Sequence, residues 1–218
     1  MSPARIALVA AGLTLAVTVS YAQPYPAKPI RLIVTYPAGG GTDLVARLIA
    51  QKLTQSLGRN VIVENRAGAN GNIGTDAIAK AAPDGYTIGM ATPGPVTIGK
   101  TLYTNLPYDP QRDLVPIILV NASPNVLAVH PSVTAHSVRE LVALAARHPM
   151  HIGASTIASV QHLLAEMFNR AAHVQMQIIT YKGGAQAAVD VAGGQIEALW
   201  SVLPVVLPII SWKRLRLL

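Results

Sequence analysis

The sequence predicts an α/β fold in which parallel or mixed sheets are flanked by helices. Apolar runs of strand length alternate along the chain with segments whose apolar residues recur at helical spacing. Turns rich in glycine, proline, aspartate and asparagine separate these segments. Such alternation is typical of βαβ units, in which successive strands run parallel and a helix covers the sheet between them.

The expected elements follow one another in a regular order. The expected strands are the apolar runs at residues 30–35, 61–64, 86–91, 115–120, 126–130, 151–154, 175–181 and 196–202. The expected helices lie at residues 42–57, 72–82, 137–147, 159–170 and 185–192. The proline-rich residues 107–116 and the Ser123-Pro124 step indicate irregular surface segments. We therefore expect a first lobe over residues 23–124 and a second lobe over residues 125–218.

Residues 1–22 are expected to be a signal peptide rather than part of the fold. Arg5 supplies a positive start, residues 6–19 are apolar, and Ser20-Tyr21-Ala22 offers a small-x-small cleavage site. The apolar stretch is too short and wrongly flanked for a membrane span. No cysteine follows it that could hold a lipid anchor. The pattern predicts an exported protein that is cleaved near Ala22.

Composition excludes several kinds of function. The 218-residue chain has no cysteine, which excludes disulfides, thiolate metal sites and cysteine nucleophiles. The net charge of +7 comes from basic residues that fall singly until Lys213, Arg214 and Arg216, and Phe168 is the only phenylalanine. Without a basic stripe interleaved with aromatic residues, the chain is not expected to bind nucleic acid. A weak positive field that attracts acidic solutes is the better use of this charge.

Residues 36–43, Tyr-Pro-Ala-Gly-Gly-Gly-Thr-Asp, form what we call the glycine-rich loop. The loop joins the expected strand 30–35 to the expected helix 42–57. A helix start presents backbone N–H groups without intrahelical partners and the positive end of the helix dipole, where proteins bind anions. The glycines let ligand oxygens approach the backbone without interference from Cβ atoms. The loop therefore predicts a site for a carboxylate or a phosphate.

The sequence also narrows the kind of anion. A nucleotide P-loop needs a Gly-Lys-Ser/Thr ending and a dinucleotide turn needs G-x-G-x-x-G, and neither occurs in this loop. Asp43 is well placed to cap the helix and to compensate its dipole, and it would repel a polyphosphate. The alternative is a plain capped turn between a strand and a helix, without a ligand. The loop alone leaves both interpretations open.

Two later turns resemble this one. Residues 66–74 contain glycines at G-x-x-G-x-x-G spacing, which favours tight turns and close helix packing over dinucleotide binding. Residues 155–159, Ser-Thr-Ile-Ala-Ser, lead from the strand 151–154 into the helix 159–170, and we call them the serine loop. Its hydroxyls and the helix start offer hydrogen-bond donors. If the two loops face each other, they are able to hold the two ends of a dicarboxylate.

Catalytic interpretations have less support. Ser159 and His162 are three residues apart on one helix face, but a serine hydrolase would need a strained G-x-S-x-G elbow and an orienting aspartate. An N-cap serine beside a helix-face histidine explains the pair more simply. The histidines never fall in H-x-x-x-H or H-E-x-x-H spacing, so we expect no zinc site.

Residues 25–43, from Tyr-Pro-Ala-Lys-Pro-Ile through the glycine-rich loop, are very similar to the mature start of the tripartite tricarboxylate transporter receptors, also called Bug receptors. Further matches are Glu-Asn-Arg-Ala-Gly-Ala at 64–69, Ala-Pro-Asp-Gly-Tyr-Thr at 82–87, Pro-Tyr-Asp at 107–109 and Tyr-Lys-Gly at 181–183. The resemblance runs from about Gln23 to the C-terminus. Several motifs in the correct order make it specific.

The resemblance implies a type II periplasmic-binding-protein-like fold that closes around its ligand as a Venus flytrap, by motion at a hinge. It implies a monomeric periplasmic receptor, not an enzyme, that delivers a small di- or tricarboxylate or related organic acid to a tripartite tricarboxylate-type membrane permease. No cofactor or metal is expected. The ligand-binding residues implied are Ala38, Gly39, Gly40, Thr42 and Asp43, then Ser155, Thr156 and Ser159, and finally Ser201.

The chain departs from the family in the serine loop and at Ser201. The serine loop usually ends Gly-x-Gly-Ser, whereas residues 156–159 here are Thr-Ile-Ala-Ser, so the approach of a ligand to the backbone is narrower. The position of Ser201 is often aspartate, and serine favours a more anionic solute.

The ending is the third departure. Family members continue beyond the position of Leu218 and return to the first lobe, so the C-terminal part is expected to be missing here, with weak stability or aggregation as the result. The alternatives are a truncated remnant that binds nothing and, more remotely, a secreted serine hydrolase using Ser159 and His162.

Overall fold

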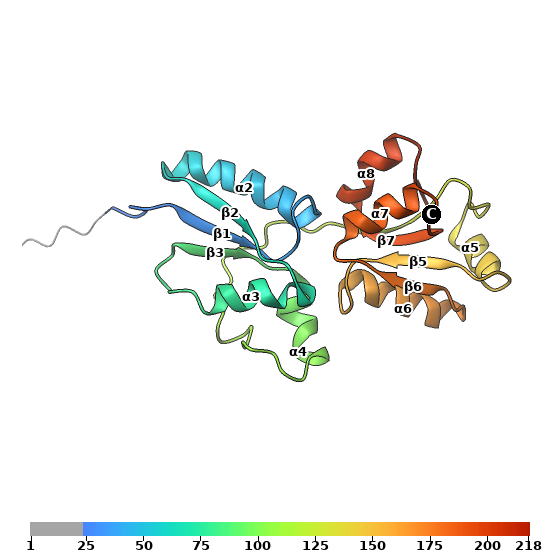
Figure 1. Cartoon of the computed structure of the whole chain (residues 1–218), viewed down its shortest axis with the longest axis horizontal. Helices are drawn as coiled ribbons and strands as arrows, with labels where there is room; N and C mark the ends of the chain where they lie inside the picture. Colours follow the sequence, from blue (N-terminus) through green and yellow to red (C-terminus); the bar gives the residue numbers. More distant parts are fainter. Residues whose placement is uncertain (1–23) are drawn as a thin grey trace, which may run out of the picture.

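The computed structural model describes residues 24–218, which form two sheets that lie side by side along the long axis (Figure 1). The expected signal peptide, residues 1–22, lies outside the described residues. The first sheet has the order β2-β1-β3, and both pairings are parallel. Its strands are β1 (Ile30–Val34), β2 (Val61–Asn65) and β3 (Thr87–Met90).

Helices cover both faces of this first sheet (Figure 1). They are α2 (Gly41–Leu57), α3 (Asn72–Ala79) and α4 (Gly99–Leu102), with the short 3-10 helix η1 (Ala69–Gly71) and the short π-helix η2 (Gly94–Ile98). Strand β1 is buried at every position except Arg31, as its apolar sequence predicts for a central parallel strand. Helix α2 packs Ala46 and Ala50 against the sheet and ends at Gly58, whose left-handed backbone closes the last turn.

The second sheet is mixed and has the order β6-β5-β7-β4-β8. Its strands are β4 (Asn125–Val129), β5 (His151–Ala154), β6 (Gln177–Thr180), β7 (Ala198–Val202) and β8 (Arg216–Leu217). Strand β5 pairs parallel with β6 and β7, whereas β4 runs antiparallel to β7 and β8. The covering helices are α5 (Val138–Ala145), α6 (Val160–Ala172), α7 (Gly184–Ala192) and α8 (Leu203–Ser211). The predicted α/β class with mixed and parallel sheets is confirmed.

The core of the second sheet is built on both of its faces. On one face Leu141 and Ile152 are fully buried, and Phe168 of α6 meets the ring of Trp200 edge-on with centroids 6.2 Å apart. The guanidinium of Arg216 donates to the backbone carbonyls of Val133 (2.9 Å) and Ala135 (2.6 Å). These bonds tie the last strand to the loop that precedes α5.

The predicted strand at residues 115–120 is wrong. These residues have no regular structure, and Val115, Ile117 and Leu119 are 88%, 79% and 82% exposed. An apolar β-branched run is compatible with a strand, but a strand also needs a partner, and none of the strands within residues 24–218 pairs with it. Helix α8 and the turn-and-helix segment η2–α4 were not predicted. Pro208 inside α8 argues against a helix, although the proline at its start is compatible with one.

The double substitution Ile117→Ser and Leu119→Ser is expected to reduce self-association of the purified chain, because exposed apolar segments of this kind promote aggregation. Neither side chain belongs to a core, so the free energy of unfolding should change by no more than about 0.5 kcal/mol. Light scattering during storage measures the first effect and urea unfolding the second. Ile33→Ser, at a position that is 1% exposed, is the control that should unfold the chain. Unchanged scattering would show that aggregation starts elsewhere.

None of the helices within residues 24–218 combines the length and the apolar character needed to cross a membrane.

Candidate functional site

The glycine-rich loop connects β1 to the start of α2. Gly39 has φ 79°, a left-handed conformation that glycine adopts without cost. Gly40 is the N-cap in extended conformation, and among the described residues no side chain caps this helix end. The first N–H groups of the 17-residue helix are therefore left for a ligand or solvent, as the sequence predicts.

The buried carboxylate of Asp43 holds this loop in place by hydrogen bonds. Its Oδ2 accepts hydrogen bonds from the Gly39 N–H (2.9 Å) and from Nε of Arg47 (2.9 Å), and its Oδ1 accepts from Nδ2 of Asn65 (2.9 Å). The same Asn65 amide donates to the Tyr36 carbonyl (3.0 Å). The expectation that Asp43 caps the helix is wrong, since its carboxylate accepts from the Gly39 N–H, which lies before the helix, and so fixes the path of residues 36–43.

Burial alone would raise the pKa of Asp43. The hydrogen bonds from Arg47, Gly39 and Asn65, together with the positive charge of Arg47, outweigh it and hold the pKa below its ordinary value of 3.8. Asp43 is therefore ionised at neutral pH although its side chain is only 3% exposed.

The serine loop connects β5 to the start of α6. Ser159 is the N-cap of this 13-residue helix, and its Oγ accepts a hydrogen bond from the backbone N–H of His162 (3.1 Å). Ser155 and Ser159 are buried, Thr156 is half-buried, and Ala158 has φ 65°. The loop therefore repeats the geometry of the first one, with serine rather than glycine at the helix cap.

Ser201 lies on β7 near the beginning of α7, and only 1% of it is exposed. Its Oγ lies 3.6 Å from the position that a Cβ on Gly184 would occupy. A Cβ built on Gly41 would lie 3.4 Å from methyl groups of Val202 and Val205. The start of α2 in the first half of the chain therefore lies against the end of β7 and the start of α8 in the second half.

The sequence analysis missed Asn70, which connects the two predicted loops. It lies in the turn 66–74 and is 4% exposed. Its side chain forms hydrogen bonds with Tyr36 in the first half of the chain and with Thr156 and Ala158 in the second half. The expected tight turns are present, since Gly68 and Gly71 both have positive φ. An asparagine between two such glycines is the signal that would have marked a left-handed position with a polar side chain.

The Ser159–His162 pair has a structural role in this fold. The hydroxyl of Ser159 is bonded to the backbone of His162 rather than to its imidazole, and the nearest acidic group to that ring is Glu166, with Nε2 and Oε1 3.9 Å apart. Over residues 24–218, no three histidine, aspartate or glutamate side chains lie close enough together to hold a metal ion.

Ser159→Ala is expected to lower the free energy of unfolding by about 1 kcal/mol, because it removes the N-cap hydrogen bond of α6. Urea unfolding measures this loss. Ser159→Asn is the matched control, since asparagine caps as well as serine and should restore most of the stability. Equal stability of the alanine variant and the wild type would mean that the cap is not formed in solution.

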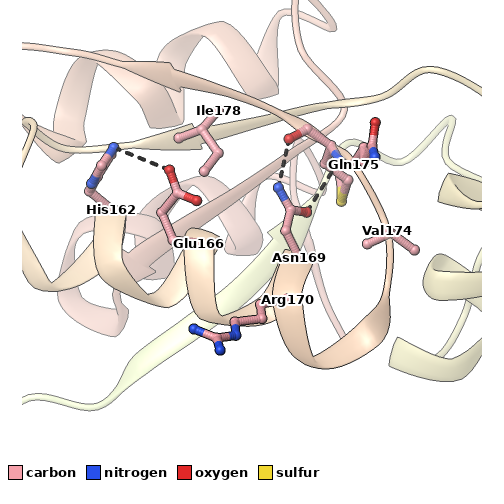
Figure 2. A pocket seen from close by; sticks show the side chains of 8 residues that line it. His162, Glu166, Asn169, Arg170, Val174, Gln175 and Ile178 are labelled. Carbon is pink, nitrogen blue, oxygen red and sulfur yellow. Dashed lines mark hydrogen bonds and ion pairs between the residues drawn. The ribbon is translucent and has the colours of Figure 1, made fainter.

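A hollow in the surface between α6 and β6 is separate from the predicted site (Figure 2). His162 and Glu166 line one end, and Asn169 fixes the other end by bonding both backbone groups of Met176. None of the predicted ligand-binding residues lines this hollow.

Known proteins are similar to this chain in sequence and in fold. Residues 45–218 match the family model described as "Tripartite tricarboxylate transporter family receptor". Protein BugT of Bordetella pertussis is 40% identical over 200 residues, which cover 90% of this chain and 61% of BugT. The chain thus spans about three fifths of the length of this relative.

Two solved structures are similar over most of the chain. One is titled "Structure of a periplasmic transporter" (37% identity, TM-score 0.85). The other is R. palustris Rpa4515 with adipate (34% identity, TM-score 0.85). Each comparison covers 89% of this chain and 66% of the solved one.

Proposed function

The chain belongs to the tripartite tricarboxylate transporter receptor family, and from this premise we propose that it captures a small organic carboxylate for a membrane permease of that transporter type. The family and its fold are those of periplasmic substrate-binding receptors rather than enzymes. Rpa4515, with which it shares 34% identity, is a protein with adipate bound. We propose that this chain acts in the same way, as an exported monomer cleaved near Ala22.

The observation that supports the proposal best is that two helix starts are paired, one beside the first sheet and one beside the second. The helices α2 and α6 each begin at a loop that leaves backbone donors available. Hydrogen bonds through Asn70 connect the base of the first loop, at Tyr36, with the second loop, at Thr156. Two separated donor groups suit a ligand that has two anionic ends, and the net charge of +7 favours its approach.

In this proposal the two loops divide the work. The backbone N–H groups of Ala38, Gly40 and Thr42 receive one carboxylate, whereas the N–H of Gly39 already donates to Asp43 and holds the loop in shape. The hydroxyls of Ser155 and Ser159 receive the other end, with the remaining predicted residues, Thr156 and Ser201, lining the space between them. Asp43 acts through the loop that it shapes, because both of its oxygens already accept hydrogen bonds. The boundary between the two lobes near residue 124 is a prediction. In this proposal the hinge lies at residues 121–125.

Calorimetric titration of the purified chain with acetate, succinate, adipate and citrate tests the proposal. We expect one ligand per chain and tighter binding of a dicarboxylate than of acetate. Ser201→Ala should weaken binding by about tenfold, the loss of one hydrogen bond to a charged group. Ser132→Ala is the matched control, because Ser132 is exposed and bonds only His130 among the described residues.

A sample that is folded by circular dichroism and that binds none of the four acids would contradict the proposal.

A further inference from the structure

We propose that Asn70 is a positioning residue that holds the serine loop against the first half of the chain, a role that we call the Asn70 bridge. The functional importance of the bridge rests on the proposed function, because the bridge joins the two loops that are proposed to bind the ligand. The geometry of the bridge stands independently of any ligand.

The amide of Asn70 is bonded on both of its sides. Its Nδ2 donates to the carbonyl of Ala158 (2.7 Å), and its Oδ1 accepts from Oγ1 of Thr156 (2.8 Å) and from the hydroxyl of Tyr36 (2.7 Å). A backbone carbonyl only accepts, so the NH₂ group must face Ala158 and the oxygen must face the two hydroxyls. The orientation of the amide is therefore determined by its partners.

The backbone at the bridge is unusual on both sides of the contact. Asn70 has φ 54° and ψ 33°, and Ala158 has φ 65°, so two non-glycine residues in left-handed conformation meet at one hydrogen bond. Asparagine tolerates this conformation better than other residues with side chains, and alanine does so poorly. Asparagine thus meets two demands at position 70, the backbone conformation and an amide that donates and accepts.

The bridge also decides what Thr156 can offer a ligand. The hydroxyl proton of Thr156 is directed at Asn70, so this side chain can accept from a ligand but cannot donate to its carboxylate while the bridge is formed. The donors that remain on the serine loop are the hydroxyls of Ser155 and Ser159 and the backbone N–H groups at the start of α6. Asn70 therefore sets the donor pattern of the loop without contacting the ligand.

Separation of the halves has to break these bonds. Asn70 is 4% exposed, so the bonds form away from water and an opening motion must hydrate an amide and a backbone carbonyl together. The expected consequence is a closed arrangement that is populated before any ligand arrives, which removes part of the conformational cost of capture.

Hydrogen exchange of the ligand-free chain tests the bridge without relying on binding. Asn70→Gly keeps the left-handed backbone and removes the amide, and it should accelerate exchange of the Ser159 N–H, which bonds the Thr156 carbonyl at 3.0 Å, by about tenfold. The N–H groups of β5 should exchange as before. Asn72→Ala is the matched control, since Asn72 is also buried but bonds Tyr108 within the first half of the chain.

A second variant tests the bridge from the opposite side. Thr156→Val keeps the shape and removes one of the donors, so it should accelerate the same exchange by a smaller factor. Small-angle scattering of the Asn70→Gly variant should give a larger radius of gyration without ligand. Unchanged exchange in both variants, together with an unchanged radius of the Asn70→Gly variant, would overturn the bridge. A chain that opens as described but binds no carboxylate would overturn the proposed function and leave the bridge standing.

Discussion

Asp43→Asn is expected to lower the free energy of unfolding at neutral pH by about 3 kcal/mol, because the new amide cannot accept all the hydrogen bonds that the carboxylate accepts. Whichever way the amide is turned, its NH₂ group faces a donor, either the Asn65 amide or the pair formed by the Gly39 N–H and Arg47. The same change should release the glycine-rich loop and weaken carboxylate binding. Urea unfolding and calorimetry measure the two effects.

The pH dependence gives this prediction a direction. The pKa of Asp43 is lower in the folded chain than its ordinary value of 3.8, so the carboxylate contributes stability that is fully present above that value. The contribution is lost as the pH falls through the folded pKa. The difference in unfolding free energy between wild type and Asp43→Asn should therefore be largest at neutral pH and shrink in acid. Glu166→Gln, an equal change of charge on an exposed helix position, should show no such loss. A difference that grows in acid would contradict the argument.

Gly74→Ala is expected to destabilise the chain by about 2 kcal/mol or more, although alanine is the better helix former. A Cβ at this position of α3 would lie 2.6 Å from the carbonyl oxygen of Arg66 and 3.0 Å from the Cα of Thr35. Both are backbone atoms, so neither can rotate away, and α3 would have to move off β1. The turn that contains Asn70 would move with it.

Thermal or urea unfolding measures the effect of Gly74→Ala. Gly184→Ala is the matched control, because the nearest atom to its Cβ would be Oγ of Ser201 at 3.6 Å, an ordinary contact. It should change the free energy of unfolding by less than about 0.5 kcal/mol. Equal effects of the two substitutions would mean that the close contact of α3 with β1 relaxes at little cost.

Local sequence was sufficient to predict those helices and strands whose own residues have a clear pattern. The apolar run of β1, the helical spacing of α2 and the serine cap of α6 each predicted the correct element to within a residue or two. Residues 115–120 have the composition of a strand, but strand formation depends on a partner that local sequence does not report. Helix α8 was missed for the opposite reason. Pro208 makes its local sequence unfavourable for a helix, but the packing of Val206 in the core stabilises the helix.

The candidate site was predictable from the sequence as two separate loops, but the way in which the two loops are joined was not. The glycines and serines at the two helix starts indicated anion sites from spacing alone, and the structure places both loops at those helix starts. That Asp43 accepts from Asn65 and that Asn70 reaches Thr156 depends on residues 22 and 86 positions apart, which no local pattern encodes. Only the packing of the two halves brings such residues together.

The edge-on contact of Trp200 with Phe168 has a practical consequence for spectroscopy. The only tryptophans in the chain are Trp200, in β7, and Trp212, just after α8, so both report on the half that is built on the second sheet. The first sheet contributes to far-ultraviolet circular dichroism but is silent in tryptophan emission. Unfolding curves from the two signals will coincide only if both sheets melt as a single cooperative unit, and any separation between the curves measures how independently the halves unfold.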